Sequence, residues 1–249
     1  MLTYGVTMSI DQARRAIRYL LDSRNPGDAL GAYYAYHHDN NRTHLATIPT
    51  DSSQSAEGYI ATSRTGIDLF RPLLTMRLPI HNLEASAQLL RQALPPANEA
   101  FVICPITYDP IVRAIYEVRT EQTLAIYMMD KAKLQAEINV LVTREDKNQL
   151  PRFVIKQMVE GHREAVAAAG LNWQSPHFAE IAVRTHANYR RRGLGRSVVT
   201  ALAQHIFNHG RTPLYAVALD NQPSIDLARR VGFHDTGYRQ LMLEVRARG

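Results

Sequence analysis

The strongest restriction on the fold of this 249-residue chain comes from a strand that turns through two glycines into a helix. Residues 178–185 (FAEIAVRT) have the apolar, β-branched pattern of a strand, and Gly193 and Gly195 then precede a helical run. The start of a helix leaves several backbone N–H groups without intrahelical partners. The helix dipole and the guanidinium groups of residues 190–192 favour an anion there, so the segment predicts a site that fits a pyrophosphate.

Two common phosphate-binding loops do not fit this segment. A dinucleotide fingerprint needs a third glycine three residues after Gly195, and the chain has Val198 there. Asp220 does close the following strand, but without that glycine an acidic residue gives weak support. A P-loop of nucleotide triphosphatases needs Gly-Lys followed by Ser or Thr, and no Gly-Lys pair occurs in the sequence.

Two motifs in this region agree in order and separation with a known family. Arg190-x-x-Gly193-x-Gly195, followed by Asn221-x-x-Ser224-x-x-Leu227, resembles the acyl-CoA signature of the GNAT superfamily of N-acetyltransferases. The likeness covers about residues 178–238, and within the superfamily the lead-in and the turn at 210–213 look most like the C-terminal domains of glycine N-acyltransferase-like proteins. The resemblance implies an acyltransferase that moves an acyl group, most simply acetyl from acetyl-CoA, to a primary amine of a small molecule or peptide.

The resemblance also implies roles for individual residues. In the family, the strand before the turn binds the pantetheine arm, the turn amides hold the pyrophosphate of coenzyme A, and an asparagine and a serine further on line the same cofactor. The expected cofactor-binding residues are Val183, Arg184, Thr185, Arg190, Arg191, Arg192, Gly193, Leu194, Gly195, Arg196, Asn221 and Ser224.

The catalytic groups depart from the family pattern. The family often has a tyrosine acid directly after the leucine that matches Leu227, whereas this chain has Ala228. Tyr238 is the expected substitute, with Tyr215 or water as alternatives. Glu180 is the expected base, although its register differs by about one residue from the glutamate of some family members. Because the usual acid is absent, a non-catalytic acyl-CoA sensor or scaffold is the second function that the sequence allows.

The order of elements recurs along the chain. A helix, a strand, a proline-containing helix start and a closing strand occur at residues 83–129 and again at 198–245. We therefore expect an α/β fold with a mixed sheet: a GNAT domain at 134–249 and a degenerate GNAT-like half at 1–133 that lacks the coenzyme A turn. Chance alternation of helices and strands would give the same order, and the polar run 145–148 is an alternative boundary.

The net charge of +6 and the pI near 9.5 require that anionic partners be considered. Nucleic acid is disfavoured because the arginine patch lacks interleaved aromatic residues. The sequence identifies neither the amine acceptor nor an oligomeric state. Tyr33, Tyr34 and Tyr36 are expected in the core, with an acceptor pocket as the alternative.

The cysteine, histidine and hydropathy patterns bear on metal binding and on the cellular compartment. The single Cys104 allows neither an internal disulfide nor a zinc cluster, and His205 and His209 lack a third ligand, so no metal is expected. No apolar run approaches the ~20 residues that cross a bilayer, and no apolar leader region is visible at the N-terminus. We expect a cytoplasmic protein with no membrane partner.

Overall fold

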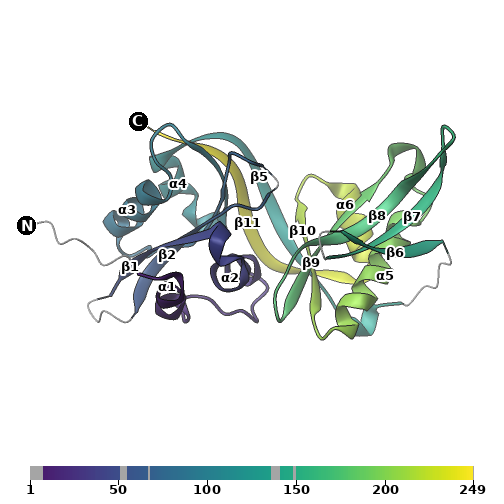
Figure 1. Cartoon of the computed structure of the whole chain (residues 1–249), viewed down its shortest axis with the longest axis horizontal. Helices are drawn as coiled ribbons and strands as arrows, with labels where there is room; N and C mark the ends of the chain where they lie inside the picture. Colours follow the sequence, from purple (N-terminus) through teal and green to yellow (C-terminus); the bar gives the residue numbers. More distant parts are fainter. Residues whose placement is uncertain (1–7, 51–54, 67, 136–140, 148–149, 249) are drawn as a thin grey trace, which may run out of the picture. The chain divides into compact units, whose positions relative to one another are not determined.

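The computed structural model divides the chain into two compact units. It describes residues 8–50, 55–66, 68–135, 141–147 and 150–248. Unit 1 comprises Met1–Thr123 and Arg239–Gly249, and unit 2 comprises Leu124–Tyr238. The chain passes between the units twice, within β5 (Tyr116–Met129) and within β11 (Phe233–Ala247), as Figure 1 shows. Residues 1–7, on which the expected lack of a leader depends, lie outside the described residues.

Unit 1 is a mixed sheet with helices. Its strands follow the order β1-β2-β3-β4-β11, in which β3 and β4 are the only parallel pair within the described ranges. Its other elements are α1 (Ile10–Ile17), α2 (Ala29–Ala32), the π-helical turn η1 (Tyr33–His37), η2 (Asn40–Arg42), β1 (Thr43–Pro49), β2 (Ala56–Ser63), β3 (Leu73–Arg77), α3 (Leu83–Ala93), β4 (Glu99–Pro105), η3 (Ile106–Tyr108) and α4 (Asp109–Ile115).

The strands of unit 2 also pair in a mixed arrangement. They follow the order β5-β10-β9-β8-β7-β6, in which, among the described residues, only β9 and β10 pair in parallel. The other elements of unit 2 are η4 (Lys131–Lys133), β6 (Val142–Lys147), β7 (Leu150–Val159), β8 (His162–Gln174), β9 (Phe178–Thr185), η5 (Ala187–Tyr189), α5 (Leu194–Asn208), β10 (Thr212–Ala218) and α6 (Gln222–Val231).

Helix α1 begins where the sequence predicts but ends earlier than expected. Ser9 and Gln12 form the expected capping box. The helix nevertheless ends at Ile17, although the apolar spacing predicted a helix to about residue 22. The following residues turn instead: Arg18 N–H donates to Arg15 O at 3.4 Å, and Leu20 N–H donates to Ile17 O at 2.9 Å.

Strands β6, β7 and β8 of unit 2 were not predicted from the sequence. Residues 145–147, expected in a polar loop, form part of the outermost strand β6, and Asn148 lies outside the described residues. An outermost strand tolerates charged side chains because it pairs on one side only. No elements were predicted at 142–174, where β6, β7 and β8 lie. Irregular register at Ile155 and near Asn172 interrupts the alternation that would have indicated strands.

The two units exchange closing strands. Strand β4 of unit 1 pairs with the C-terminal part of β11, whereas β10 of unit 2 pairs with Leu124–Met128 of β5. Each unit therefore contains a segment from the other half of the sequence. This exchange explains why the units divide within β5 and β11 rather than at the expected boundary of 133 and 134, and the duplication itself stays a prediction.

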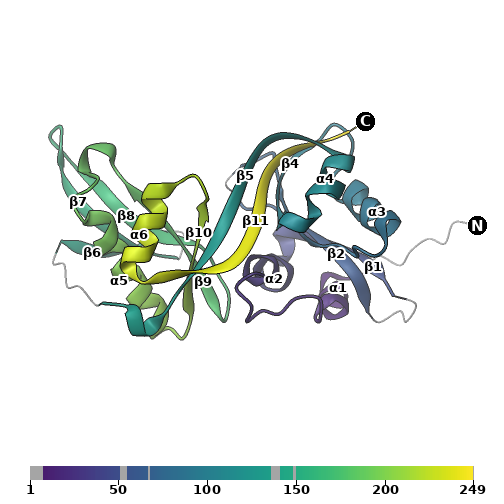
Figure 2. The same cartoon turned by 180° about the vertical axis from the view of Figure 1, so that it is seen from behind.

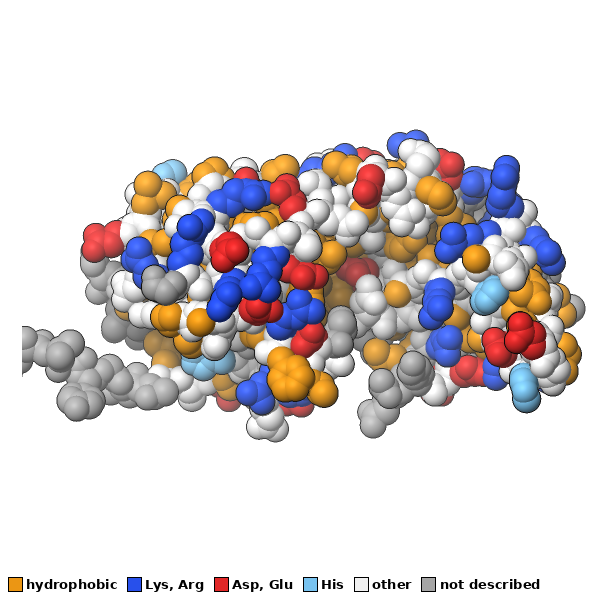
Figure 3. All heavy atoms as spheres, turned by 90° about the horizontal axis from the view of Figure 1, so that it is seen from above, with side chains coloured by type: hydrophobic (Ala, Val, Ile, Leu, Met, Phe, Trp, Pro, Cys, Tyr) orange, Lys and Arg blue, Asp and Glu red, His pale blue; other side chains and the backbone are white. Residues whose placement is uncertain are grey.

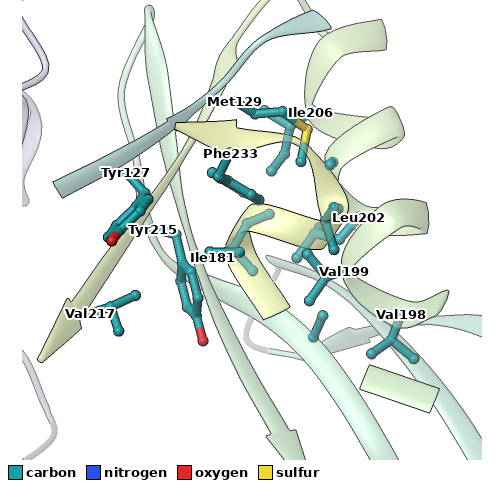
Figure 4. Close-up of a cluster of buried hydrophobic side chains, with 14 of the residues drawn as sticks. Tyr127, Met129, Ile181, Val198, Val199, Leu202, Ile206, Tyr215, Val217 and Phe233 are labelled. Carbon is teal, nitrogen blue, oxygen red and sulfur yellow. The ribbon is translucent and has the colours of Figure 1, made fainter. Parts of the chain in front are cut away.

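The core of unit 2 lies on one face of its sheet. Ile181 from β9, Leu202 from α5 and Ile225 from α6 belong to one buried cluster, so both helices cover the same face of the sheet (Figure 2). Figure 4 shows Ile181 and Leu202 in this cluster. In unit 1, α3 and α4 pack with Leu74 and Val102 in a separate core. No helix in the described part of the chain is long and apolar enough to cross a membrane.

The core position of Leu202 gives a stability prediction. Leu202 is 0% exposed, and Leu202→Ala is expected to destabilise the protein by about 2–5 kcal/mol because it leaves a cavity. The matched control is Leu219→Ala at a position 48% exposed, which should change stability by about 0.5 kcal/mol or less. Urea unfolding of both variants tests this, and equal midpoints would contradict the assigned core.

Candidate anion and acyl-transfer site

The turn between β9 and α5 is shaped by two residues with left-handed backbone. Arg191 has φ +62°, and Gly193, the residue before α5, has φ +76°. No side chain caps this helix start among the described residues. The first intrahelical bond at this end runs from Ser197 N–H to Gly193 O at 3.1 Å, so the N–H groups of Leu194 and Gly195 lie in the turn before it.

The two glycines of the motif are required for different reasons. Gly193 needs the left-handed backbone, and a Cβ there would lie in open space, with no described atom within 4 Å. A Cβ on Gly195 would lie 3.1 Å from Thr185 Oγ1 and 3.6 Å from Leu227 Cδ2. Only Gly193 therefore leaves room for a ligand, and Gly195 instead lets the end of β9, the start of α5 and helix α6 come close together.

Three consecutive arginines surround the turn. Arg190, Arg191 and Arg192 are exposed, and Arg190 Nε donates a long hydrogen bond of 3.4 Å to Thr185 O. The guanidinium of Arg192 lies 5.2 Å from the centre of the Tyr189 ring. On the face of the molecule drawn in Figure 3, basic side chains are interspersed with acidic and uncharged ones. The positive charge that matters for an anion is therefore the local charge of the turn and of the helix start.

The second motif lies at the start of α6. Asn221 Oδ1 accepts a hydrogen bond from Ser224 N–H at 3.2 Å and so caps this helix. Helix α6 reaches the glycine turn through Leu227, which lies beside Gly195. The structure thus brings α6, with Asn221 and Ser224 in its first turn, against the element that carries the arginine motif.

Strands β9 and β10 separate next to this turn. They pair in parallel only from Phe178–Thr212 to Glu180–Leu214. Beyond this point Val183, Arg184 and Thr185 pair on one side with β8, opposite Ala169, Ala168 and Ala167, while β10 continues beside β5. The backbone groups on the other edge of β9 face the region where the two strands diverge.

Glu180 lies at the last position where β9 pairs with β10. Asn172 Nδ2 donates to one carboxylate oxygen at 2.6 Å, and Trp173 Nε1 donates to the other at 2.9 Å. Burial raises the pKa of Glu180 above its ordinary value, and these two hydrogen bonds oppose the rise because they favour the carboxylate. Sequence reasoning missed both donors, since the bulge that presents Asn172 leaves no local signal in β8.

The tyrosines considered as acids occupy different strands. Tyr238 is 42% exposed on β11, two residues beyond Thr236, whose hydroxyl donates to Ile126 O of β5 at 2.6 Å. Tyr215 is 8% exposed on β10, one residue beyond the last β9–β10 pair, and lies against Phe233 (Figure 4). Burial raises the pKa of Tyr215, and a hydrogen bond with the Ser224 side chain opposes this. Ala228 is buried in the core.

The histidine pair on α5 forms no larger ligand cluster. The rings of His205 and His209 are 4.1 Å apart, and His209 Nδ1 lies 2.7 Å from the carbonyl oxygen of His205. Within the described ranges, no group of three or more His, Cys, Asp or Glu side chains is placed to hold a metal ion.

One family model matches part of the chain. The model of the FR47-like protein family matches residues 159–241. This range covers most of unit 2 and ends within β11. The chain has no significant match among curated proteins. The sequence likeness is therefore confined to the part of the chain that contains the turn and both motifs.

Solved structures resemble the whole chain. A GCN5-related N-acetyltransferase-like protein from Streptococcus suis is 16% identical, with a TM-score of 0.60 over 94% of this chain and 99% of that one. A tandem GNAT protein from the clavulanic acid biosynthesis pathway is 11% identical, with a TM-score of 0.60 over 100% and 97%. A GCN5-related N-acetyltransferase from Sphaerobacter thermophilus is 10% identical, with a TM-score of 0.61 over 96% and 94%. The chain has the mixed α/β fold of GNAT proteins.

The two donors to Glu180 give a prediction about its pKa. Trp173→Phe removes one hydrogen bond to the carboxylate while retaining an aromatic ring, so the pKa of Glu180 should rise further. The side-chain carboxyl ¹³C signal of Glu180, followed through a pH titration, measures the change. Trp173→Phe and wild type titrating together would show that the indole does not stabilise the charged form.

Proposed function

We propose that this protein is an acyl-CoA-dependent N-acyltransferase, with acetyl-CoA as the donor and a primary amine of a small molecule or peptide as the acceptor. One observation carries the proposal: α5 begins without a side-chain cap, among the residues described, behind a left-handed glycine and three arginines. This start lies directly after the strand that diverges from its parallel neighbour. The GNAT fold and the match to the FR47-like family support the same function.

The turn fits the diphosphate of coenzyme A. The open space beside Gly193, the amides of residues 191–196 and the guanidinium of Arg190 and Arg192 would receive its negative charge. At the beginning of the same loop, His186 Nδ1 is buried and has no partner in the described residues, which supports a site that a ligand completes. We assign Asn221 and Ser224 to the same cofactor through the first turn of α6.

The diverging strands would receive the pantetheine arm. We infer that it lies along Val183, Arg184 and Thr185, whose backbone has no β10 partner at these positions. When bound, acyl-CoA supplies a thioester carbonyl that an amine can attack. The role of the chain is to hold this carbonyl where the two strands separate, beside Glu180.

Glu180 is our proposed base. Its raised pKa, with both oxygens fixed by Asn172 and Trp173, suits a carboxylate that accepts a proton from an attacking amine. Leu214 is the parallel register partner of Glu180, so these two side chains share a face of the sheet, and Tyr215 projects from the opposite face. Glu180 and Tyr215 would thus act from opposite faces of the sheet, at the point where β9 and β10 separate.

For the acid we favour Tyr215 over the expected Tyr238. Tyr215 adjoins the divergence of β9 and β10, and its hydroxyl is bonded to the Ser224 side chain. Its raised pKa keeps the phenol protonated, which is the form that can donate to a departing thiolate. Tyr238 remains the alternative.

We propose a single coenzyme A site for each chain, with unit 1 as a degenerate GNAT-like half. The corresponding helix of unit 1, α3, follows β3, which pairs with β4 over three positions just as β9 pairs with β10. Its start has no glycine turn, and Asn82 Oδ1 already accepts a hydrogen bond from Ala85 N–H at 3.0 Å. A capped helix start leaves less capacity for an anion.

We also propose a branch of the superfamily and a cellular location for this protein. The glycine N-acyltransferase-like branch is favoured by the sequence lead-in to the turn, and a cytoplasmic location by the single buried Cys104. Ala228 at the usual acid position favours one second candidate, a non-catalytic acyl-CoA sensor or scaffold. Release of the coenzyme A thiol from acetyl-CoA in the presence of an amine would support the enzyme. Binding of acetyl-CoA without this release would support the sensor or scaffold.

Gly193 provides the test of cofactor binding. Gly193→Ala should weaken coenzyme A binding by about tenfold or more, because a methyl group enters the open space where the diphosphate would lie. Gly210→Ala is a matched control: it lies at the other end of α5, also with positive φ (+72°) and open space, so its backbone strain is similar. Calorimetric titration measures both, and equal affinities in the two variants would refute the diphosphate site.

Substitution of the proposed base and acid tests the chemistry. Glu180→Gln should lower kcat by about 10²-fold or more and remove the rise of kcat with pH that follows deprotonation of Glu180, while coenzyme A affinity is kept. Tyr215→Phe should lower kcat by about tenfold, and Tyr238→Phe should not. Thiol release from acetyl-CoA with an amine library measures these rates. A wild-type protein that binds acetyl-CoA but releases no thiol with any amine would favour the sensor.

A further inference from the structure

One face of β9 carries two oppositely charged side chains beside the point where this strand leaves β10. Ile181 belongs to the core of unit 2, and Val183 packs against that core. Because side chains alternate along a strand, Glu180, Ala182 and Arg184 point to the opposite face. Of the two charges on this face, the proposed proton transfer uses only the carboxylate of Glu180.

The guanidinium group of Arg184 has no carboxylate partner among the described residues. Arg184 is exposed, and its register partner on β8 is Ala168, whose side chain has no polar atom. Arg152 of β7 shares this face but differs in its surroundings: it is the register partner of Glu145 on β6, and its Nη1 lies 4.0 Å from Glu145 Oε2. Arg184 is therefore the arginine of this face that is free to bind an anion from outside the chain.

The surface between Glu180 and Arg184 is formed by small residues. Ala182 lies between them on β9 and has Gly170 as its partner on β8. Both Ala182 and Gly170 are partly exposed, so a narrow chain can lie over them. In our assignment the pantetheine arm lies along the edge of β9 that faces β10, which leaves this face of the strand to the acceptor.

The spacing of the two charges limits the length of a molecule that contacts both. Four strand residues place the Cα atoms of Glu180 and Arg184 about 13 Å apart. The carboxylate of Glu180 accepts hydrogen bonds from Asn172 and Trp173 of β8, so it is held toward β8 rather than toward Arg184. An α-amino acid has one carbon between its amine and its carboxylate, which is too short to contact both side chains.

We propose that the acceptor is a primary amine with an anionic group at the far end of a short chain, and that Arg184 binds this group. This inference rests on the proposed acyl transfer at Glu180. The amine would lie at Glu180, the chain over Ala182 and the anion at Arg184, because a guanidinium group binds carboxylates and phosphates through paired hydrogen bonds. Arg184 contacts only the far end of the acceptor, so it determines specificity and takes no part in the proton transfer.

Binding of 6-aminohexanoate tests the inference without turnover. Titrated into the ¹⁵N-labelled full chain, it should shift the side-chain Nε–H signal of Arg184 and the amide signals of Ala182 and Gly170, with a dissociation constant on the order of 1 mM. Hexylamine has the same chain without the carboxylate, and glycine is too short to reach both groups. Both should bind here at least about tenfold more weakly. Equal binding of either compound, or an unshifted Arg184 signal, would overturn the inference.

Two arginine variants test the specificity of the reaction. Arg184→Gln should raise the ratio of KM for 6-aminohexanoate to KM for hexylamine about tenfold, and Arg184→Lys, which keeps the charge, should retain most of the preference. Arg152→Gln, on the same face beside Glu145, is the matched control and should leave the ratio unchanged. Thiol release from acetyl-CoA measures these values.

The outcomes separate this inference from the proposed function. An unchanged ratio in Arg184→Gln would overturn the inference, and weaker coenzyme A binding in the same variant would assign the guanidinium group to the cofactor instead. If the wild-type protein releases no thiol with any amine, the acyl transfer is refuted. In that case the difference in binding between 6-aminohexanoate and hexylamine still decides whether Arg184 recognises the anion.

Discussion

The left-handed backbone at Gly193 is the constraint on which the proposed chemistry depends. It allows the chain to turn from η5 directly into α5, so that the helix starts with its first N–H groups in the turn rather than under a side-chain cap. In unit 1 the comparable helix α3 starts under the side chain of Asn82. The starts of α3 and α5 lie in similar strand–helix–strand arrangements. They differ in whether backbone N–H groups are available to bind an anion.

The second feature that matters for function is the short parallel pairing of β9 and β10. Both strands continue after they separate, because β8 supports one of them and β5 supports the other. The exchange of closing strands is therefore part of the site: the partner of β10 comes from the first half of the sequence. Glu180 and Tyr215 lie at adjacent register positions of this divergence and on opposite faces, which is the arrangement that our proposal of Glu180 as base and Tyr215 as acid requires.

The sequence predicts the elements with strong local signals. The glycine turn, the apolar face of α5 and the start of α6 at Asn221 all depend on residues close together in the chain, and the structure has these elements where they were expected. Long-range features were not predictable in this way. The exchange of β5 and β11 depends on which of several similar strands pair, and the donors to Glu180 depend on a bulge in β8. The packing role of Gly195 required the position of Thr185, which only the fold provides.

The central claim is that the backbone amides at the start of α5 hold the diphosphate of coenzyme A. Titration of ¹⁵N-labelled protein with coenzyme A, followed by amide chemical shifts, tests this claim most directly. The account predicts the largest shifts at Gly193, Leu194 and Gly195, reaching saturation at one equivalent per chain. Shifts that leave these amides unchanged, or that cluster at the start of α3 near Asn82, would contradict it.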